Sequence, residues 1–226
     1  MPDWLHLMWQ SLWPLLVGGV QFTVPLALLS FAAGLALAFW AALARLFAPA
    51  PVVLLVRFYI WLIRGTPLLV QLFVIFYGLP SMGIVLDPFT AALIGFSLNI
   101  GAYNAEVIRG AIEAIPRGQW DAAYSIGMTR AQAMRRTILP QAARVAVPPL
   151  ANSFIALVKD TSLAAVITVP EIFQAAQRIA SVTYEPLVLY VEAALIYLVL
   201  CSVLSSAQVR LERHFSRHAV FAEGQR

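Results

Sequence analysis

Apolar residues along this chain fall into five long runs, which shorter polar or proline-containing segments separate. A helix needs about 20 mostly apolar residues to cross the hydrocarbon core of a bilayer, and each run reaches that length. The pattern therefore predicts an all-α fold, that of a polytopic membrane protein with five transmembrane helices in a single domain covering residues 1–226. We expect the spans at about residues 15–44, 52–77, 88–112, 145–169 and 186–207.

One connection, at about residues 113–144, is longer and more polar than a turn between two spans requires. Its residues predict two short helices, at 119–126 and 130–139, on either side of a turn at Gly127. Thr129 can cap the second helix with its hydroxyl, and Pro140 is expected to end that helix. The residues alone leave two roles open: a surface that docks a partner outside the membrane, or an amphipathic helix lying on the bilayer.

The composition supports a membrane protein, since 61% of the residues are hydrophobic and only 12% are charged. A soluble domain of this size cannot bury so much apolar surface, so membrane lipid is the expected solvent. The net charge of +4 does not indicate a nucleic-acid partner, because the basic residues lie mostly at the ends of apolar runs and in the long connection. No metal-ligand spacing, nucleophile–base pair or paired carboxylates stand out, so we expect neither a metal site nor catalytic residues.

The basic residues also predict the orientation of the chain. Arg45 and Arg57 flank the first connection, five arginines lie in or beside the long connection, and Arg210, Arg213 and Arg217 follow the fifth run. Short loops rich in Lys and Arg face the cytoplasm. The amino terminus is therefore expected outside and the carboxyl terminus inside, which agrees with an odd number of spans.

Charged residues inside a span are costly and usually mark a substrate route. Lys159, Asp160 and Ser162 interrupt the fourth run. Asp160 can receive the ammonium group of an amino acid. Lys159 can face the carboxylate of that amino acid, or can extend to an interface with no role in binding. Glu192 in the fifth run has no local basic partner, and the sequence assigns it no role.

A second interruption divides the second run at the segment Arg64-Gly65-Thr66-Pro67. Glycine and proline together favour an irregular backbone near the middle of the membrane. Arg64 suits bidentate binding of a carboxylate, and a structural arginine reaching toward the cytoplasmic face is equally consistent with its position. Gln71, two turns further on, can share the wall of a binding site with Arg64.

The third run carries Tyr103 and Asn104. The Asn104 amide is expected to line a cavity, because an unsatisfied amide in lipid is costly. Glu106 has a structural explanation. Arg109 follows it by three residues and can also reach Glu113, which predicts an ion network on the helix surface.

The long connection resembles the EAA loop of binding-protein-dependent ATP-binding-cassette (ABC) importers. In that family, two alanines follow an acidic residue, a glycine stands four positions after the second alanine, and Leu-Pro comes further on. Four other segments, at residues 64–71, 77–88, 99–112 and 152–172, resemble the polar-amino-acid subgroup of these permeases, and within it the membrane subunits of bacterial L-cystine importers. The matching loop residues are Asp121, in place of the usual glutamate, with Ala122, Ala123, Gly127, Leu139 and Pro140.

The resemblance implies the fold of a type I ABC importer transmembrane domain, in which the loop forms a cytoplasmic coupling helix seated in a groove of the ATPase. It implies a transport subunit of the bacterial cytoplasmic membrane and not an enzyme. The chain has no GxxxxGK[ST] phosphate loop and is expected to hold no cofactor, so separate ABC ATPase subunits would use ATP–Mg. The other partners implied are a periplasmic or lipid-anchored amino-acid-binding protein and a second permease subunit, with a homodimer favoured.

The function so implied is import of a polar amino acid, L-cystine or a related compound, by alternating access. The alternative is a secondary amino-acid transporter driven by an ion gradient, with Asp160 as the proton or cation site. Such a transporter usually has more spans and needs no docking loop. In either case we expect the substrate path to include Arg64, Thr66, Gln71, Tyr103, Asn104, Lys159, Asp160 and Ser162.

Overall fold

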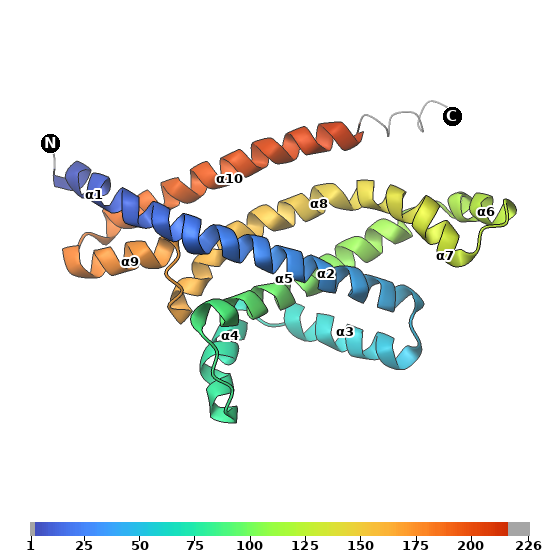
Figure 1. Ribbon diagram of the computed structural model, residues 1–226, viewed down its shortest axis with the longest axis horizontal. Helices are drawn as coiled ribbons and strands as arrows, with labels where there is room; N and C mark the ends of the chain where they lie inside the picture. Colours follow the sequence, from blue (N-terminus) through green and yellow to red (C-terminus); the bar gives the residue numbers. More distant parts are fainter. Residues whose placement is uncertain (1–2, 217–226) are drawn as a thin grey trace.

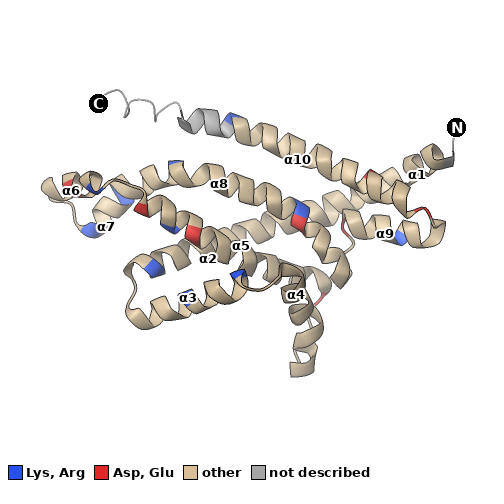
Figure 2. Ribbon diagram, turned by 180° about the vertical axis from the view of Figure 1, so that it is seen from behind, with Lys and Arg blue, Asp and Glu red and all other residues tan. Residues whose placement is uncertain are grey.

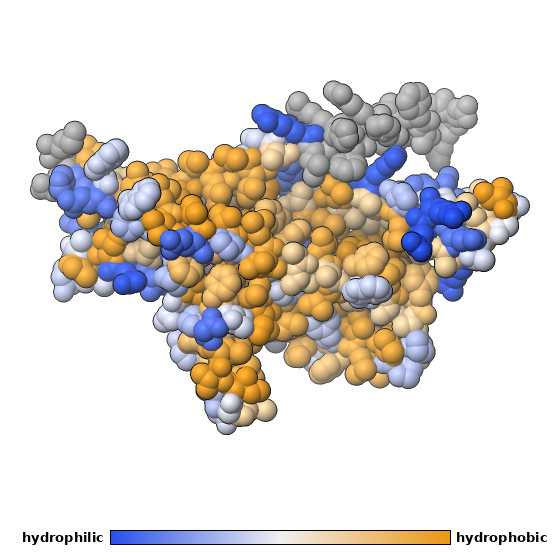
Figure 3. Space-filling view, viewed as in Figure 1, coloured by the Kyte–Doolittle hydropathy of each residue, from blue (hydrophilic) through white to orange (hydrophobic). Residues whose placement is uncertain are grey.

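The computed structural model describes residues 3–216, and within this range it contains helices and turns but no strand. The helices form an elongated bundle, with the amino terminus and α9 at one end and α6 and α7 at the other (Figure 1). Figure 3 shows an apolar middle between two more hydrophilic ends, as expected of a protein that crosses a bilayer. Arg217, one of the residues used to predict the orientation, lies outside the described residues.

The first apolar run forms a rod longer than a single span requires. Helix α1 (Asp3–Gly18) continues through a π-helical turn (Gly19–Thr23) into α2 (Val24–Phe47). The π-helical turn lies where the rod touches the loop that precedes α9. A Cβ atom on Gly18 would lie 3.1 Å from backbone atoms of Glu171, so glycine lets the loop approach the helix backbone.

The second apolar run is broken. Helix α3 (Ala50–Arg64) is followed by α4 (Leu68–Phe73), and α4 continues through a π-helical turn (Val74–Gly78) and a 3₁₀ turn (Leu79–Met82). The two halves of the run are bent by 104° relative to each other. Pro67 accounts for the break, because it has no backbone N–H and disfavours helical geometry in the residue before it. The irregular backbone predicted here is confirmed.

Helix α5 (Pro88–Glu113) lies at the centre of the bundle. Its amino terminus is capped by Asp87, whose side chain accepts a hydrogen bond of 3.0 Å from the Thr90 N–H. The hydrogen bonds to Thr90 lower the pKa of the Asp87 carboxyl. Helix α2 packs closely along α5, and a Cβ atom on Gly34 would lie only 2.6 Å from Cγ2 of Ile100. Small residues at this contact let the two backbones approach each other.

The long connection forms α6 (Arg117–Ser125) and α7 (Arg130–Ala133). Helix α7 runs on through a π-helical turn (Met134–Ile138) into α8 (Leu139–Asp160). The prediction that Pro140 ends the second short helix is therefore wrong. Pro140 lies in the first turn of α8, immediately after the wider π-helical turn, where a missing N–H and a proline ring are tolerated.

A 3₁₀ turn (Thr161–Ile167) follows α8, and α9 (Ile172–Thr183) and α10 (Pro186–Ser216) complete the described chain. Helix α9 lies in the fourth connection and is too short to span a membrane. The five apolar runs gave no indication of it, because its apolar residues occupy one face only.

Within residues 3–216, four helices are long and apolar enough to cross a membrane, and the bent pair α3–α4 makes up to five. Each predicted run falls on one of these five segments, so the prediction of five transmembrane helices is confirmed. The first and fourth helices extend well beyond the predicted runs. The four unbent segments are Trp4–Phe47, Pro88–Glu113, Arg130–Ile167 and Pro186–Arg210.

Candidate functional site

A pocket of about 340 Å³ opens at the break in the second span, between α5 and the end of α8. Three of its lining residues, Thr66, Tyr103 and Asp160, belong to the predicted substrate path. Two further polar residues, Asn99 and Ser153, also line it and were not predicted. Asn99 lies one helical turn before Tyr103, and Ser153 lies two turns before Asp160. Helical spacing from the predicted residues is the signal that would have found both.

Gln71 holds the broken backbone together beside the pocket. The carbonyl oxygen of Ile63 has lost its usual helical donor, because residue 67 is a proline without N–H. Gln71 Nε2 donates to this oxygen at 2.7 Å, and to the carbonyl and hydroxyl oxygens of Thr66 at 3.1 and 2.9 Å. Gln71 Oε1 accepts a long hydrogen bond of 3.5 Å from Asn99 Nδ2. The buried Gln71 side chain thus positions two lining residues and does not line the pocket itself.

Arg64 lies beside the pocket, on the exposed end of α3. Its guanidinium carbon is 5.2 Å from the centroid of the Tyr103 ring, a cation–π contact that ties α3 to α5. No ion pair within residues 3–216 involves Arg64. Its planar set of N–H donors therefore remains available to a carboxylate near Tyr103.

Lys159 and Asp160 end α8, and they face different spaces. Asp160 lines the 340 Å³ pocket, whereas Lys159 and Ser162 line a separate pocket of about 570 Å³ against α9 and α10. Successive residues of a helix point about 100° apart, which explains the separation. The structure therefore gathers Asp160 with Thr66 and Tyr103, and places Lys159 and Ser162 elsewhere.

Two polar residues of α5 lie away from this pocket. Asn104 is 1% exposed, and its Nδ2 has no hydrogen-bond partner among the described residues. Glu106 pairs with Arg109 at 2.9 Å, and Arg109 pairs with Glu113 at 2.5 Å, so the predicted ion network is confirmed. Arg45 of α2 also pairs with Glu106. This last partner was not predicted, because it comes from another helix.

The predicted coupling segment lies at the end of the molecule formed by α6 and α7, and most basic residues gather toward this end (Figure 2). Gly127 has a φ of +78°, a left-handed conformation that glycine adopts without strain and that allows the turn between the two helices. Thr129 caps α7 as predicted. Its hydroxyl accepts from the Gln132 N–H at 3.3 Å, and Gln132 Oε1 accepts from the Thr129 N–H at 2.9 Å.

The outer surface of α6 combines small, polar and apolar residues. Asp121 and Ala122 are exposed, whereas Ala123 is buried against the rest of the chain. Near them, Tyr124 is 43% exposed and Ile126 is 72% exposed. Large apolar side chains exposed at the tip of a polar loop are typical of a surface that binds a partner.

Apolar and polar contacts hold the α6–α7 segment to the membrane-spanning helices. Leu139 packs against the apolar cluster shared by α2, α5 and α8. The guanidinium carbon of Arg130 lies 4.6 Å from the ring centroid of Phe47, the last residue of α2. Gln141 Nε2 donates to Gln119 Oε1 at 3.0 Å, which joins α6 to the start of α8. The segment is therefore braced on both α2 and α8.

Glu171 is a buried carboxylate that the sequence did not single out. Its Oε1 accepts from the Gln174 N–H at 2.7 Å, which caps α9, and its Oε2 accepts from the Tyr197 hydroxyl at 2.5 Å. Burial raises the pKa of the Glu171 carboxyl, and the hydrogen bond from Tyr197 acts in the opposite direction. Glu171 joins α9 to α10, and its position in a connection outside the apolar runs concealed that role.

Residues 34–217 match the protein family described as the binding-protein-dependent transport system inner membrane component, and the chain belongs to that family. It is therefore the membrane permease component of an ABC transporter, a transport subunit of the inner membrane. Its fold is that of a type I importer transmembrane domain, since a solved amino acid ABC transporter chain superposes with a TM-score of 0.89 at 36% identity. That match covers 95% of this chain and 99% of the solved one.

Two characterised relatives match nearly the whole chain. The L-cystine transport system permease protein TcyB of Bacillus subtilis (strain 168) is 51% identical over 210 residues, which cover 92% of this chain and 90% of TcyB. The glutamine transport system permease protein GlnP of Escherichia coli (strain K12) is 38% identical over 210 residues, which cover 91% and 96%. A solved chain of the MetNI methionine ABC transporter shares the fold, with a TM-score of 0.70. The match covers 95% of this chain and 99% of the solved one, at 19% identity.

Proposed function

We propose that this chain is the permease subunit of an ATP-driven importer for a polar amino acid, with L-cystine as the leading substrate. Family membership supports separate ATPase subunits that use ATP–Mg and a separate amino-acid-binding protein. The similarity to a relative named as an L-cystine permease supports the substrate. The observation that carries the proposal is the pocket at the broken span, which gathers Asp160 with uncharged polar groups from α5, α8 and the break itself.

The chemistry of this pocket suits a zwitterion. The Asp160 carboxylate can pair with an ammonium group, and Asn99, Tyr103 and Ser153 offer hydrogen-bonding groups around it. Arg64, stacked on Tyr103, is the basic residue best placed to meet the carboxylate of the substrate. A volume of about 340 Å³ also lies within the usual range of pockets for small ligands.

In this proposal the chain is one transmembrane domain, residues 1–226, that pairs with a second copy. Its amino terminus faces outside, and the segment at residues 113–144 faces the cytoplasm. The coupling helix α6 would enter a groove of the ATPase, with Asp121, Ala122 and Ala123 at the contact and Gly127 forming the turn behind it. Leu139 and Pro140 would carry the motion into α8.

The decisive experiment replaces Asp160 with asparagine in the complete transporter, reconstituted in vesicles with saturating binding protein. Loss of the charge should lower ATP-driven uptake by about tenfold or more, the effect of one charge-assisted interaction. Asp87→Asn is the matched control, since Asp87 caps α5 outside the pocket and should leave uptake unchanged. Normal uptake by the Asp160→Asn transporter would remove the substrate-path assignment.

A second reconstitution separates this proposal from ion-gradient-driven transport. The permease alone is placed in vesicles under an imposed proton or sodium gradient, with no ATPase and no ATP. Our proposal requires that no amino acid accumulates under these conditions. Accumulation that follows the ion gradient would establish the secondary-transporter reading, with Asp160 as the ion site.

A further inference from the structure

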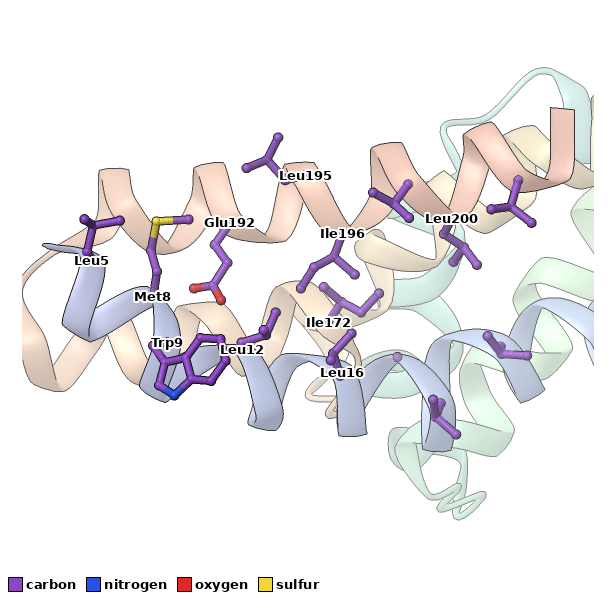
Figure 4. A pocket seen from close by; sticks show the side chains of 15 residues that line it. Leu5, Met8, Trp9, Leu12, Leu16, Ile172, Glu192, Leu195, Ile196 and Leu200 are labelled. Atoms are coloured by element: carbon purple, nitrogen blue, oxygen red, sulfur yellow. The ribbon is translucent and has the colours of Figure 1, made fainter. Parts of the chain in front are cut away.

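A long apolar groove of about 640 Å³ runs between α1 and α10, and a single carboxylate lies in it (Figure 4). Its walls include Met8, Trp9 and Leu12 of α1, and Leu195 of α10. Figure 4 shows Glu192 directed from α10 into the space between the two helices. The groove is separate from the pocket at the broken span, and the transport proposal does not use it.

The Glu192 carboxylate is only partly satisfied by the protein. Its Oε2 accepts a hydrogen bond of 2.5 Å from the Ser11 hydroxyl. Glu192 as a whole is only 3% exposed. Its Oε1 atom is buried and has no hydrogen-bond partner among the described residues. An acceptor left without a donor in apolar surroundings is strongly unfavourable. Glu192 Oε1 can therefore accept a hydrogen bond from a donor outside the described residues.

Glu192 lies near the end of α10 at which the fifth span begins. Glu192 lies six residues after Pro186, the first residue of α10, which places it about 9 Å along the helix. Trp9 and Trp13 of α1 are 79% and 73% exposed, and exposed tryptophans at a span entrance are typical of the membrane interface. This end of α1 and α10 is therefore expected to lie toward one membrane interface.

The length of the groove fits one acyl chain. From Glu192 the groove extends along α10 to Val203, eleven residues further on, which is about 16 Å of helix. One leaflet contributes about half of the roughly 30 Å hydrocarbon core. The apolar walls below Glu192 thus match the depth of a single leaflet.

We propose that this groove is a binding site for a membrane phospholipid with a primary ammonium headgroup, such as phosphatidylethanolamine. The ammonium donates an N–H to Glu192 Oε1, and one acyl chain lies along α1 and α10. A choline headgroup has the positive charge but no N–H donor, and a glycerol headgroup has donors but no positive charge. The site therefore distinguishes these three lipids by the chemistry of one contact.

The test uses the full chain, purified with its bound partners and reconstituted in vesicles that contain acyl-brominated phosphatidylethanolamine or phosphatidylcholine in phosphatidylglycerol. Bromine quenches nearby tryptophans, and the difference between the natural chain and Trp9→Phe isolates the signal of Trp9 in the groove. Quenching of Trp9 should reach half its maximum at about a tenfold lower mole fraction of the ethanolamine lipid.

Glu192→Gln should abolish this preference, because the amide keeps its shape but loses the charge. Glu185→Gln is the matched control, since Glu185 is an exposed carboxylate just before α10, and it should retain the preference. Equal quenching of Trp9 by the two lipids in the chain with the natural Glu192 would by itself overturn the proposal. A preference retained in Glu192→Gln would also overturn it. So would efficient disulfide formation between two copies of a Leu195→Cys chain lacking Cys201, because the groove would then be a contact between subunits.

Discussion

Replacing Gly34 with alanine tests the close packing of α2 on α5, the contact that positions the central helix. The new Cβ atom would lie 2.6 Å from Cγ2 of Ile100 and 2.9 Å from the carbonyl oxygen of Ser97, whereas ordinary contacts begin at 3.4 Å. The Ile100 side chain can move slightly, but the Ser97 oxygen belongs to the backbone of α5. The two helices must therefore move apart.

The expected loss follows from two opposing effects. Overpacking of a core costs about 1–3 kcal/mol, and the higher helix propensity of alanine offsets up to about 1 kcal/mol. We expect a net loss of about 1–2 kcal/mol, or a fall of about 2–8 °C in the unfolding midpoint for a chain of this size. Gly110→Ala is the matched control, because no atom lies within 4 Å of the new Cβ. It should leave the midpoint unchanged or raise it.

The assay is thermal unfolding of the full chain in mild detergent, with Ile100→Ala added as a second substitution. If Gly34→Ala acts through Ile100, the smaller side chain should relieve part of the damage, with a coupling energy of about 0.5 kcal/mol or more. Strict additivity, or a Gly34→Ala midpoint equal to that of Gly110→Ala, would refute the packing explanation.

Three further predictions concern the break, the coupling turn and the cap of α5. Gln71→Leu removes two hydrogen bonds to the broken backbone and a third to the Thr66 hydroxyl. The free energy of unfolding should therefore fall by about 1–3 kcal/mol and the KM for uptake should rise, whereas Gln21→Leu at an exposed position should change neither. Gly127→Val forces a β-branched residue into a φ of +78°, and it should abolish the coupling of ATP hydrolysis to uptake while membrane insertion persists. Gly118→Val is the control, because there is open space around its Cβ. Coupled uptake by the Gly127→Val variant would contradict the docking role. Asp87 has a lowered pKa in the folded chain, so its stabilising contribution is present at neutral pH and is lost as the pH falls through that lowered pKa. Asp87→Asn keeps a cap but cannot be protonated. The fall of the unfolding midpoint at acid pH should therefore be smaller in this variant.

Local rules were sufficient where a single segment determines its own structure. The apolar runs located the spans, and the proline at residue 67 located the break. The hydroxyl of Thr129 located the cap of α7, and the spacing of Glu106 from Arg109 located an ion pair within one helix. In each case the interacting groups lie within a few residues of each other, so the pattern along the chain contains the answer.

Contacts between helices were not accessible in the same way. Arg45 reaches Glu106 across two helices, and Glu171 meets Tyr197 through the packing of α9 on α10. Which of the two residues, Lys159 or Asp160, faces the pocket depends on the rotation of α8 about its axis, which neighbouring helices determine. A short range of the sequence contains no signal for that rotation.

The wrong prediction at Pro140 has a mechanical consequence for the proposed transport cycle. A helix that ended at this residue would leave a flexible joint between the coupling segment and the fourth span. Instead, one helical segment covers Arg130–Ile167, so it carries Leu139 near the proposed coupling helix α6 and also Ser153 and Asp160 at the pocket. Leu139 and Asp160 are 21 residues apart, or about 30 Å along the helix. Because a continuous helix resists bending, a displacement that an ATPase imposes on α6 and that reaches α7 would move the pocket wall directly. Only the small reorientation allowed by the adjacent prolines of α8 would be lost between the two sites.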